Sequence, residues 1–160
     1  MVIFCDSLHQ VTGQKKPISS GIRVYAIAGE GGYVFDTSFH LADGTKISEH
    51  VLKLVKTLTA EGHIIALDNL FTSTTLFKTL KTQGINVCGT NRNGRGAPYT
   101  KEEASSFLEK KGDYIEMWSD DIRWSCWLDG GPATMMTTFG DDIRPTSVKR
   151  REPGCHDRVV

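Results

Sequence analysis

Two acidic residues stand where strand ends are expected, and they are the first candidates for chemistry. Asp68 follows the short apolar run His63–Leu67, and Glu30 lies between glycines just after the alternating stretch Gly21–Ala28. In open α/β sheets, functional groups gather beyond the carboxyl ends of strands, so these carboxylates form a candidate pair that could hold a metal ion. Two other interpretations stay open: the Asp68-Asn69 pair is also typical of a turn or helix cap, and Glu30 of a solvated hairpin.

Two arginines in a glycine-rich loop are candidates for contacts with phosphate. Arg92 and Arg95 lie in the stretch NRNGRGAP, residues 91–98. Glycines let the backbone approach a ligand closely, and the guanidinium fork matches phosphate oxygens. Arginine pairs in loops are also often only solvated, so both interpretations remain.

The tryptophans, histidines and cysteines give weaker signals. Trp118, Trp124 and Trp127 could stack on bases, although packing within a sheet is the favoured interpretation. His40 and His63 fall on expected strands, where a buried histidine with its hydrogen bonds satisfied is the ordinary case. The four cysteines lie far apart without zinc-ligand spacing, so we expect reduced thiols.

Composition limits the classes of protein to consider. The chain has 160 residues, 39% of them hydrophobic and 24% charged, and 19 basic residues balance 19 acidic ones. This is enough apolar material for one domain that folds without disulfide bonds. Zero net charge gives no global attraction to nucleic acid, so an anionic partner must be met by a local patch. Because the apolar runs are short and the N-terminus lacks signal-peptide features, we expect a soluble, non-secreted protein without a membrane partner.

Periodicity and turn signals predict the order of helices and strands. The expected elements are an edge strand running into a loop within Met1–Ser20, strands Gly21–Ala28 and Gly32–His40, a helix Ser48–Ala60 capped by Ser48, a strand His63–Leu67, a helix from Ser73 or Thr74 to Gln83, a strand Ile85–Gly89, a short helix Lys101–Lys110, and strands Asp113–Trp118, Ile122–Leu128 and Ala133–Phe139.

This order predicts an α/β fold of RNase H-like type. Two antiparallel strands, a helix and a strand–helix–strand crossover would form a mixed sheet flanked by helices. The last three strands, separated by short turns, would add an antiparallel β meander. We expect this domain to cover residues 1–140. Residues 141–160 show no periodicity and are locally basic, which predicts a disordered tail.

One block of the sequence resembles the piggyBac-type transposases and their domesticated derivatives. Residues 66–98, ALDNLFTSTTLFKTLKTQGINVCGTNRNGRGAP, are similar to that family's hydrophobic strand, Asp-Asn-aromatic-x-Ser, helix ending in Gly, and Gly-Thr-x-Arg loop ending in Pro. The flanks GIRVYAIAGEGGYV and GDYIEMWSDDIRWSCWLDGGPATMMTT resemble the family's first catalytic strand and its later β-strands. The resemblance covers most of the chain.

The resemblance implies metal-dependent DNA cleavage and strand transfer, performed by three acids that hold two divalent ions. Carboxylate oxygens suit Mg²⁺, which is the expected cofactor. By its motif, Asp68 matches the second catalytic acid. Glu30 takes the place of the first acid when the position is counted from Tyr33, whereas counting from Gly21 leads to Gly29, which has no carboxylate.

The family's third acid has no counterpart in this sequence. It is expected beyond the meander in a Gly-Gly-Val-Asp motif, and the later aspartates, Asp141, Asp142 and Asp157, have no such context. We therefore expect a transposase-derived domain that is truncated and catalytically inactive, with transposon-end DNA as the partner implied by the resemblance. The resemblance and a short basic cluster at residues 149–151 also imply a nuclear location.

Two other functions stay open. The chain could be a domesticated, non-catalytic module that binds DNA or a protein partner through its core surface and basic tail. It could also be a remnant without function, or a gene model cut short at both ends. A steep fall of binding with salt would favour DNA, because phosphate contacts impose that dependence and protein contacts need not.

Overall fold

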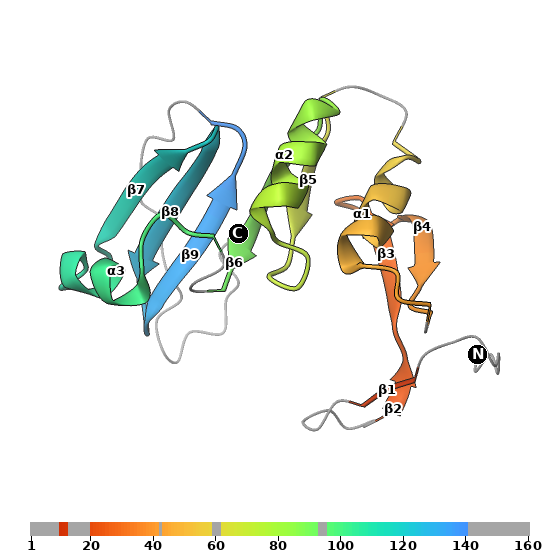
Figure 1. The fold of residues 1–160 in the computed structure, drawn as a ribbon, viewed down its shortest axis with the longest axis horizontal. Coiled ribbons are helices and arrows are strands. Elements are labelled where there is room, and N and C mark those ends of the chain that lie inside the picture. The colour runs from red at the N-terminus through yellow and green to blue at the C-terminus, as the bar shows by residue number, and fades with distance from the viewer. Residues whose placement is uncertain (1–9, 13–19, 42, 59–61, 93–95, 141–160) are drawn as a thin grey trace.

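The computed structural model describes residues 10–12, 20–41, 43–58, 62–92 and 96–140, which form nine strands and three helices (Figure 1). In chain order these are β1 Gln10–Thr12, β2 Ser20–Ile22, β3 Val24–Ala28, β4 Val34–Phe39, α1 Ile47–Val55, β5 Ile64–Leu67, α2 Thr74–Thr82, β6 Asn86–Asn91, α3 Lys101–Phe107, β7 Tyr114–Ser119, β8 Ile122–Leu128 and β9 Pro132–Thr137.

A five-stranded mixed sheet with the order β5-β6-β9-β8-β7 forms the centre of the fold. β5 and β6 run parallel, with Leu67 opposite Gly89, and α2 is the crossover between them. The other three pairs of neighbours are antiparallel. The α/β fold class and the parallel crossover predicted from the sequence are therefore confirmed.

The meander joins this sheet directly. β5 occupies one edge of β6, so the other edge is free to pair with β9, which places Cys88 opposite Thr137. The two short connections of the meander then add β8 and β7 in turn. The turn between β7 and β8 has positive φ at both Asp120 (52°) and Asp121 (62°), the geometry of a two-residue hairpin loop.

The β3–β4 hairpin forms a sheet separate from the five-stranded one, which differs from the single mixed sheet that we expected. β3 pairs with β4 in a two-stranded sheet, and α1 packs against both strands. The expected strand Gly21–Ala28 is also divided at Arg23, because its first part, β2, pairs with β1 and its second part with β4. Separate partners on the two halves explain the division.

Three helix ends, two of α1 and one of α3, depart from the sequence prediction. α1 begins after Lys46, not Ser48, and ends at Val55, because the chain then tightens into i→i−3 turns in which Leu58 N–H donates to Val55 C=O at 3.0 Å. α3 ends at Phe107 instead of Lys110. The carboxylate of Asp113 accepts the N–H groups of Glu109 (3.0 Å) and Lys110 (2.8 Å), which therefore do not continue the helix. α2 starts as predicted, with the hydroxyl of Ser73 capping it.

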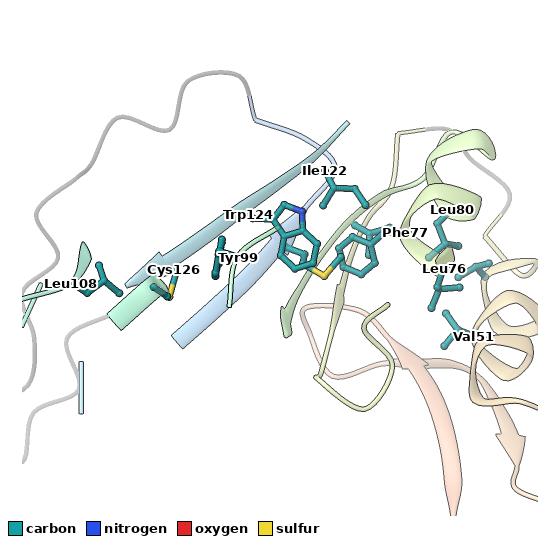
Figure 2. Packing of buried hydrophobic residues seen from close by; sticks show 13 residues of the cluster. Val51, Leu76, Phe77, Leu80, Tyr99, Leu108, Ile122, Trp124 and Cys126 are labelled. Carbon is teal, nitrogen blue, oxygen red and sulfur yellow. The ribbon is translucent and has the colours of Figure 1, made fainter. Parts of the chain in front are cut away.

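The main core lies between one face of the five-stranded sheet and α2 and α3, and Val51 and Val55 of α1 extend it (Figure 2). Phe77 and Leu80 of α2 and Trp124 of β8 are at most 1% exposed. Trp124 thus packs in the core, as favoured from the sequence. Trp118, two residues before the turn, is instead 53% exposed on the edge strand β7, and Trp127 is half-buried.

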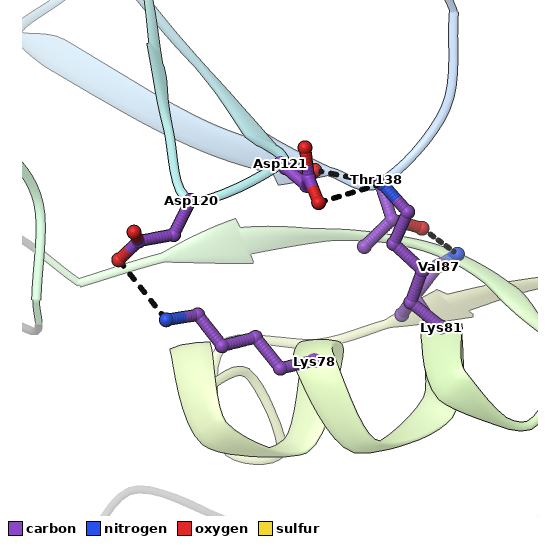
Figure 3. Close-up of polar contacts among 6 residues, drawn as sticks. All are labelled: Lys78, Lys81, Val87, Asp120, Asp121 and Thr138. Carbon is purple, nitrogen blue, oxygen red and sulfur yellow. Dashed lines mark hydrogen bonds and ion pairs between the residues drawn. The ribbon is translucent and has the colours of Figure 1, made fainter.

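Polar contacts attach α2 to the far end of the sheet (Figure 3). Lys78 Nζ lies 3.0 Å from Asp120 Oδ2, and Lys81 Nζ donates to the backbone oxygen of Asp121 at 3.3 Å. These lysines and aspartates are exposed, so each contact stabilises the fold by at most about 1 kcal/mol. Their shared effect is to fix the end of α2 over the β7–β8 turn.

Some sequence predictions fall on residues outside the described ranges. They are the apolar start of the expected N-terminal edge strand and the disordered tail at 141–160, so the domain boundary at residue 140 stays a prediction. Among the described helices, none combines the length and apolar character needed to cross a bilayer.

Candidate functional site

Asp68 lies directly after β5, in the turn that leads to α2. Its backbone oxygen accepts hydrogen bonds from the N–H groups of Phe71 (2.9 Å) and Thr72 (3.2 Å) and from the Thr72 hydroxyl (3.0 Å). Its carboxylate oxygen Oδ1 accepts the N–H of Asn69 at 2.7 Å, and the side chain as a whole is exposed. The backbone of Asp68 is therefore fixed, while its carboxylate remains accessible to a ligand.

A close approach behind this turn depends on a glycine that the sequence analysis did not single out. Gly89 of β6 lies opposite Leu67, and a Cβ built on it would stand 2.7 Å from the Leu67 backbone oxygen and 2.7 Å from the Thr72 hydroxyl oxygen. No real Cβ tolerates such distances, so a side chain here would displace the end of β5. The Gly-Thr pair, Gly89-Thr90 within the second parallel strand, was the available signal.

Glu30 lies at the tip of the β3–β4 hairpin. Gly29 N–H donates to the Tyr33 oxygen and Gly32 N–H to the Gly29 oxygen, both at 2.9 Å, and Gly32 has a φ of +78°. These bonds close the turn and leave the Glu30 side chain exposed. The solvated-hairpin interpretation and a ligand role are both compatible with this exposure.

Both acids line one pocket of about 840 Å³. One wall is β3 with its following turn, from Tyr25 to Glu30, and the other is the stretch from His63 to Asp68 around β5. α1 contributes apolar residues to the same pocket, among them Leu54. The structure thus brings the two sequence-predicted acids to one cavity, although they belong to different sheets.

Arg92 is linked through Asn69 to the turn that carries Asp68. The guanidinium Nε donates to the Asn69 side-chain oxygen at 3.1 Å, and Arg92 itself is exposed at the end of β6. Asn69 follows Asp68 directly in the chain, so this hydrogen bond ties the end of β6 to the turn that carries the acid. Arg95, the second arginine predicted to contact phosphate, lies outside the described residues.

The donor set matches a hard divalent cation in type, since carboxylate oxygens are the ligands that Mg²⁺ prefers. In the described ranges, no three His, Cys, Asp or Glu side chains gather closely enough to hold a metal ion. The pocket therefore offers two carboxylates of the type that suits a hard cation, and the described residues do not form a complete two-ion site.

A buried polar cluster beneath the hairpin was also missed by the sequence analysis. Ser38 Oγ lies 2.7 Å from His50 Nδ1, and the Tyr25 hydroxyl lies 3.3 Å from Nδ1 of His40. Tyr25, Ser38 and His50 are each at most 5% exposed. His40 and His63, expected to be buried on strands, are both half-buried and lie just outside β4 and β5, and His63 lines the pocket. The position of His50, just before Val51 on the apolar face of α1, was the signal for its burial.

Both the sequence and the fold of this chain are similar to those of known proteins. The family model described as Transposase IS4, a DDE-type family that includes the piggyBac-type enzymes, matches residues 5–156. Among solved structures, the cryo-EM structure of a piggyBac transposase synaptic complex with hairpin DNA is similar, with a TM-score of 0.76 and 20% sequence identity over 86% of this chain. The chain spans 31% of the length of that transposase chain. The protein therefore belongs to the piggyBac-type DDE transposase family.

Proposed function

We propose that this domain is derived from the catalytic core of a metal-dependent DNA transposase, in which Asp68 and Glu30 hold Mg²⁺ at the pocket between β3 and β5. The observation that supports the assignment is that both acids, predicted separately from the sequence, line the same cavity. DDE transposases as a class depend on divalent metal ions. When bound, such ions would activate the attacking oxygen and stabilise the leaving oxygen of a phosphodiester.

The residues of this chain would bind and orient DNA beside that metal position. The hydrogen bonds to the Asp68 backbone fix the turn, so its carboxylate is presented without rearrangement of β5. Arg92, held toward Asn69, offers its remaining N–H groups to a phosphate next to the acid. Zero net charge makes such local contacts necessary for any attraction to DNA.

On this proposal the 160-residue chain does not complete strand transfer by itself. In-line displacement with two metal ions needs ligands for both ions, and small errors in ligand position lower the rate steeply. Glu30 carries one methylene more than the aspartate expected there, and the described residues add no third acid to the pocket. The chain would thus retain DNA and metal binding without cleavage.

Metal binding is tested with the Asp68→Asn variant and Mn²⁺ as a paramagnetic probe. We expect the variant to bind Mn²⁺ at least about tenfold more weakly than the wild type, because loss of even an outer-shell partner commonly costs that much. Glu102→Gln, at an exposed position of α3 that does not line the pocket, is the matched control and should bind as the wild type does. Equal affinity for Asp68→Asn and wild type would contradict the metal site.

The catalytic part of the proposal has a separate test. Duplex DNA carrying transposon ends is incubated with the chain and Mg²⁺, and we expect no cleavage. Cleavage that disappears in Asp68→Asn would confirm the metal role and refute the loss of activity.

A second candidate function is a domesticated module that binds a protein partner instead of DNA. Tyr33 and Phe35 at the hairpin favour it, since they are 70% and 55% exposed and form a T-shaped pair at 5.2 Å. Affinity for duplex DNA measured at several salt concentrations separates the two functions. With phosphate contact, Arg92→Ala lowers the salt slope by about one, whereas Lys56→Ala, at the residue after α1, leaves it unchanged. Undetectable binding at low salt would leave the protein-binding function.

The site of action that fits this proposal is the nucleus, where genomic DNA is found. Fluorescence microscopy of the tagged chain tests it, and exclusion of the signal from the nucleus would contradict it.

A further inference from the structure

The two acids of the pocket follow strands of different sheets. Glu30 lies after β3, which pairs with β4, and Asp68 lies after β5, which pairs with β6. In the described ranges, no strand of the β3–β4 hairpin pairs with a strand of the five-stranded sheet. The separation of the two carboxylates therefore depends on side-chain packing between the hairpin, α1 and the turn after β5.

Tyr25 of β3 contacts that turn directly. Its side chain is buried, with 4% exposed, and its ring makes a T-shaped contact with the ring of Phe71, with centroids 5.5 Å apart and planes at 80°. The Phe71 N–H in turn donates to the backbone oxygen of Asp68 at 2.9 Å. One aromatic contact and one hydrogen bond thus lead from the strand that precedes Glu30 to the backbone of Asp68.

Further contacts hold the Tyr25 ring within the hairpin and against α1. The centroid of the His50 ring, on α1, lies 4.7 Å from that of Tyr25. The Tyr25 hydroxyl lies 3.3 Å from His40 Nδ1, and Ser38 Oγ of β4 lies 2.7 Å from His50 Nδ1. Since buried side chains interdigitate with few voids, a ring held on several sides fixes the position of the neighbour that it touches.

Other contacts would keep the hairpin attached if the Tyr25 ring were removed. Val51 and Val55 of α1 belong to the same buried cluster as Leu76 of α2, and Ile27 of β3 packs against that cluster. Loss of the Tyr25 ring should therefore shift the two acids relative to each other without separating the hairpin from the rest of the fold.

We propose that Tyr25 is a positioning residue for the metal site and that its ring, through Phe71, fixes the separation of the Glu30 and Asp68 carboxylates. This role rests on the proposed function, because it concerns how the same site is assembled. Mg²⁺ demands near-ideal geometry from its ligands, so its affinity depends on their separation. Loss of a residue that orients a metal ligand commonly weakens metal binding by about 10- to 100-fold.

Mn²⁺ binding followed by electron paramagnetic resonance tests this role. We expect Tyr25→Leu to bind Mn²⁺ at least about tenfold more weakly than the wild type. Tyr25→Phe keeps the ring and its contact with Phe71, so it should restore wild-type affinity. Tyr99→Leu is the matched control, because Tyr99 is also a buried tyrosine, with 9% exposed, and does not line the pocket; it should bind as the wild type does.

A double-mutant cycle separates positioning from a general loss of stability. Glu30→Gln removes one of the two carboxylates, so the separation between them no longer affects the ion. In that background, Tyr25→Leu should weaken Mn²⁺ binding little further, and the coupling should account for most of the effect seen in the wild type. If circular dichroism shows that Tyr25→Leu does not fold, Phe71→Leu tests the same contact from the other side, since Phe71 is only half-buried.

The outcomes distinguish the role of Tyr25 from the metal site itself. If Asp68→Asn and Tyr25→Leu both bind Mn²⁺ as the wild type does, the metal site is refuted and the role of Tyr25 with it. If Asp68→Asn weakens binding and Tyr25→Leu does not, the metal site stands and the role of Tyr25 is refuted. Equal losses in Tyr25→Leu and Tyr99→Leu, or an undiminished effect of Tyr25→Leu in the Glu30→Gln background, would also overturn this role, because binding would then follow stability alone.

Discussion

Replacing Gly89 by alanine tests how the sheet positions Asp68. The new Cβ would stand 2.7 Å from the Leu67 backbone oxygen and 2.7 Å from the Thr72 hydroxyl, and Thr72 is only 1% exposed. Neither atom is the far end of a flexible side chain, so β5 or the following turn must move by several tenths of an ångström. That turn includes the hydrogen bond from Thr72 to the Asp68 backbone oxygen.

The expected loss of stability is the balance of two destabilising contributions and one stabilising contribution. Overpacking of a buried site costs about 1–3 kcal/mol, and weakening one hydrogen bond adds about 1 kcal/mol. A Gly→Ala change also reduces the entropy of the unfolded chain, which stabilises by about 0.4–1 kcal/mol. The steric effect is larger, so we expect Gly89→Ala to lower the free energy of unfolding by about 1–3 kcal/mol.

Urea unfolding followed by tryptophan fluorescence measures this difference. Gly130→Ala is the matched control, because a Cβ there meets nothing within 4 Å and the backbone φ is not in the left-handed region. It should change stability by less than about 0.5 kcal/mol. If Gly89→Ala were as stable as Gly130→Ala, the close approach of β6 to the Asp68 turn would not exist as described.

Three further changes probe the core, the surface and a thiol. Phe77→Ala should lower the free energy of unfolding by about 3–5 kcal/mol, because the Phe77 side chain is 0% exposed. Phe107→Ala, at 67% exposure, should lower it by less than about 0.5 kcal/mol, and comparable losses in urea melts would contradict the core assignment. Lys78→Met should change the melting midpoint by the equivalent of at most about 1 kcal/mol, since its ion pair is exposed, and a larger loss would show that the contact is more than a surface pair. Burial raises the pKa of the Cys88 thiol, so less thiolate is present at pH 8 in the folded chain. Iodoacetamide should therefore label Cys88 more slowly in the folded chain than in urea, and equal labelling rates would refute the burial of this thiol.

The local sequence determined the helices and strands whose apolar periodicity and turn or capping residues are clear. Ser73 before an apolar helix predicted the start of α2, and Gln83-Gly84 its end, because capping and termination depend on neighbours within one turn. The three strands of the meander were predicted for the same reason, since their alternation and turn residues are local signals. Asp68 could be placed at a strand end because an apolar run and a turn stand side by side in the chain.

Other features depended on which strands become partners. The division of β2 from β3 at Arg23 arises because β1 and β4 pair with different halves, and neither partner can be read from the residues around Arg23. The end of α3 at Phe107 depends on the carboxylate of Asp113, which reaches back from beyond the helix. The short distance behind Gly89 exists only once β5 and β6 lie side by side.

For the candidate site, the sequence supplied the two acids and the tertiary structure supplied their common pocket. Glu30 and Asp68 are separated by α1 and by two strands, so no spacing rule relates them. The packing of α1 against the hairpin and the position of β5 place both carboxylates at one cavity. Side-chain chemistry is a property of each residue, whereas a shared site requires long-range packing, and that packing depends on contacts between segments far apart in the chain.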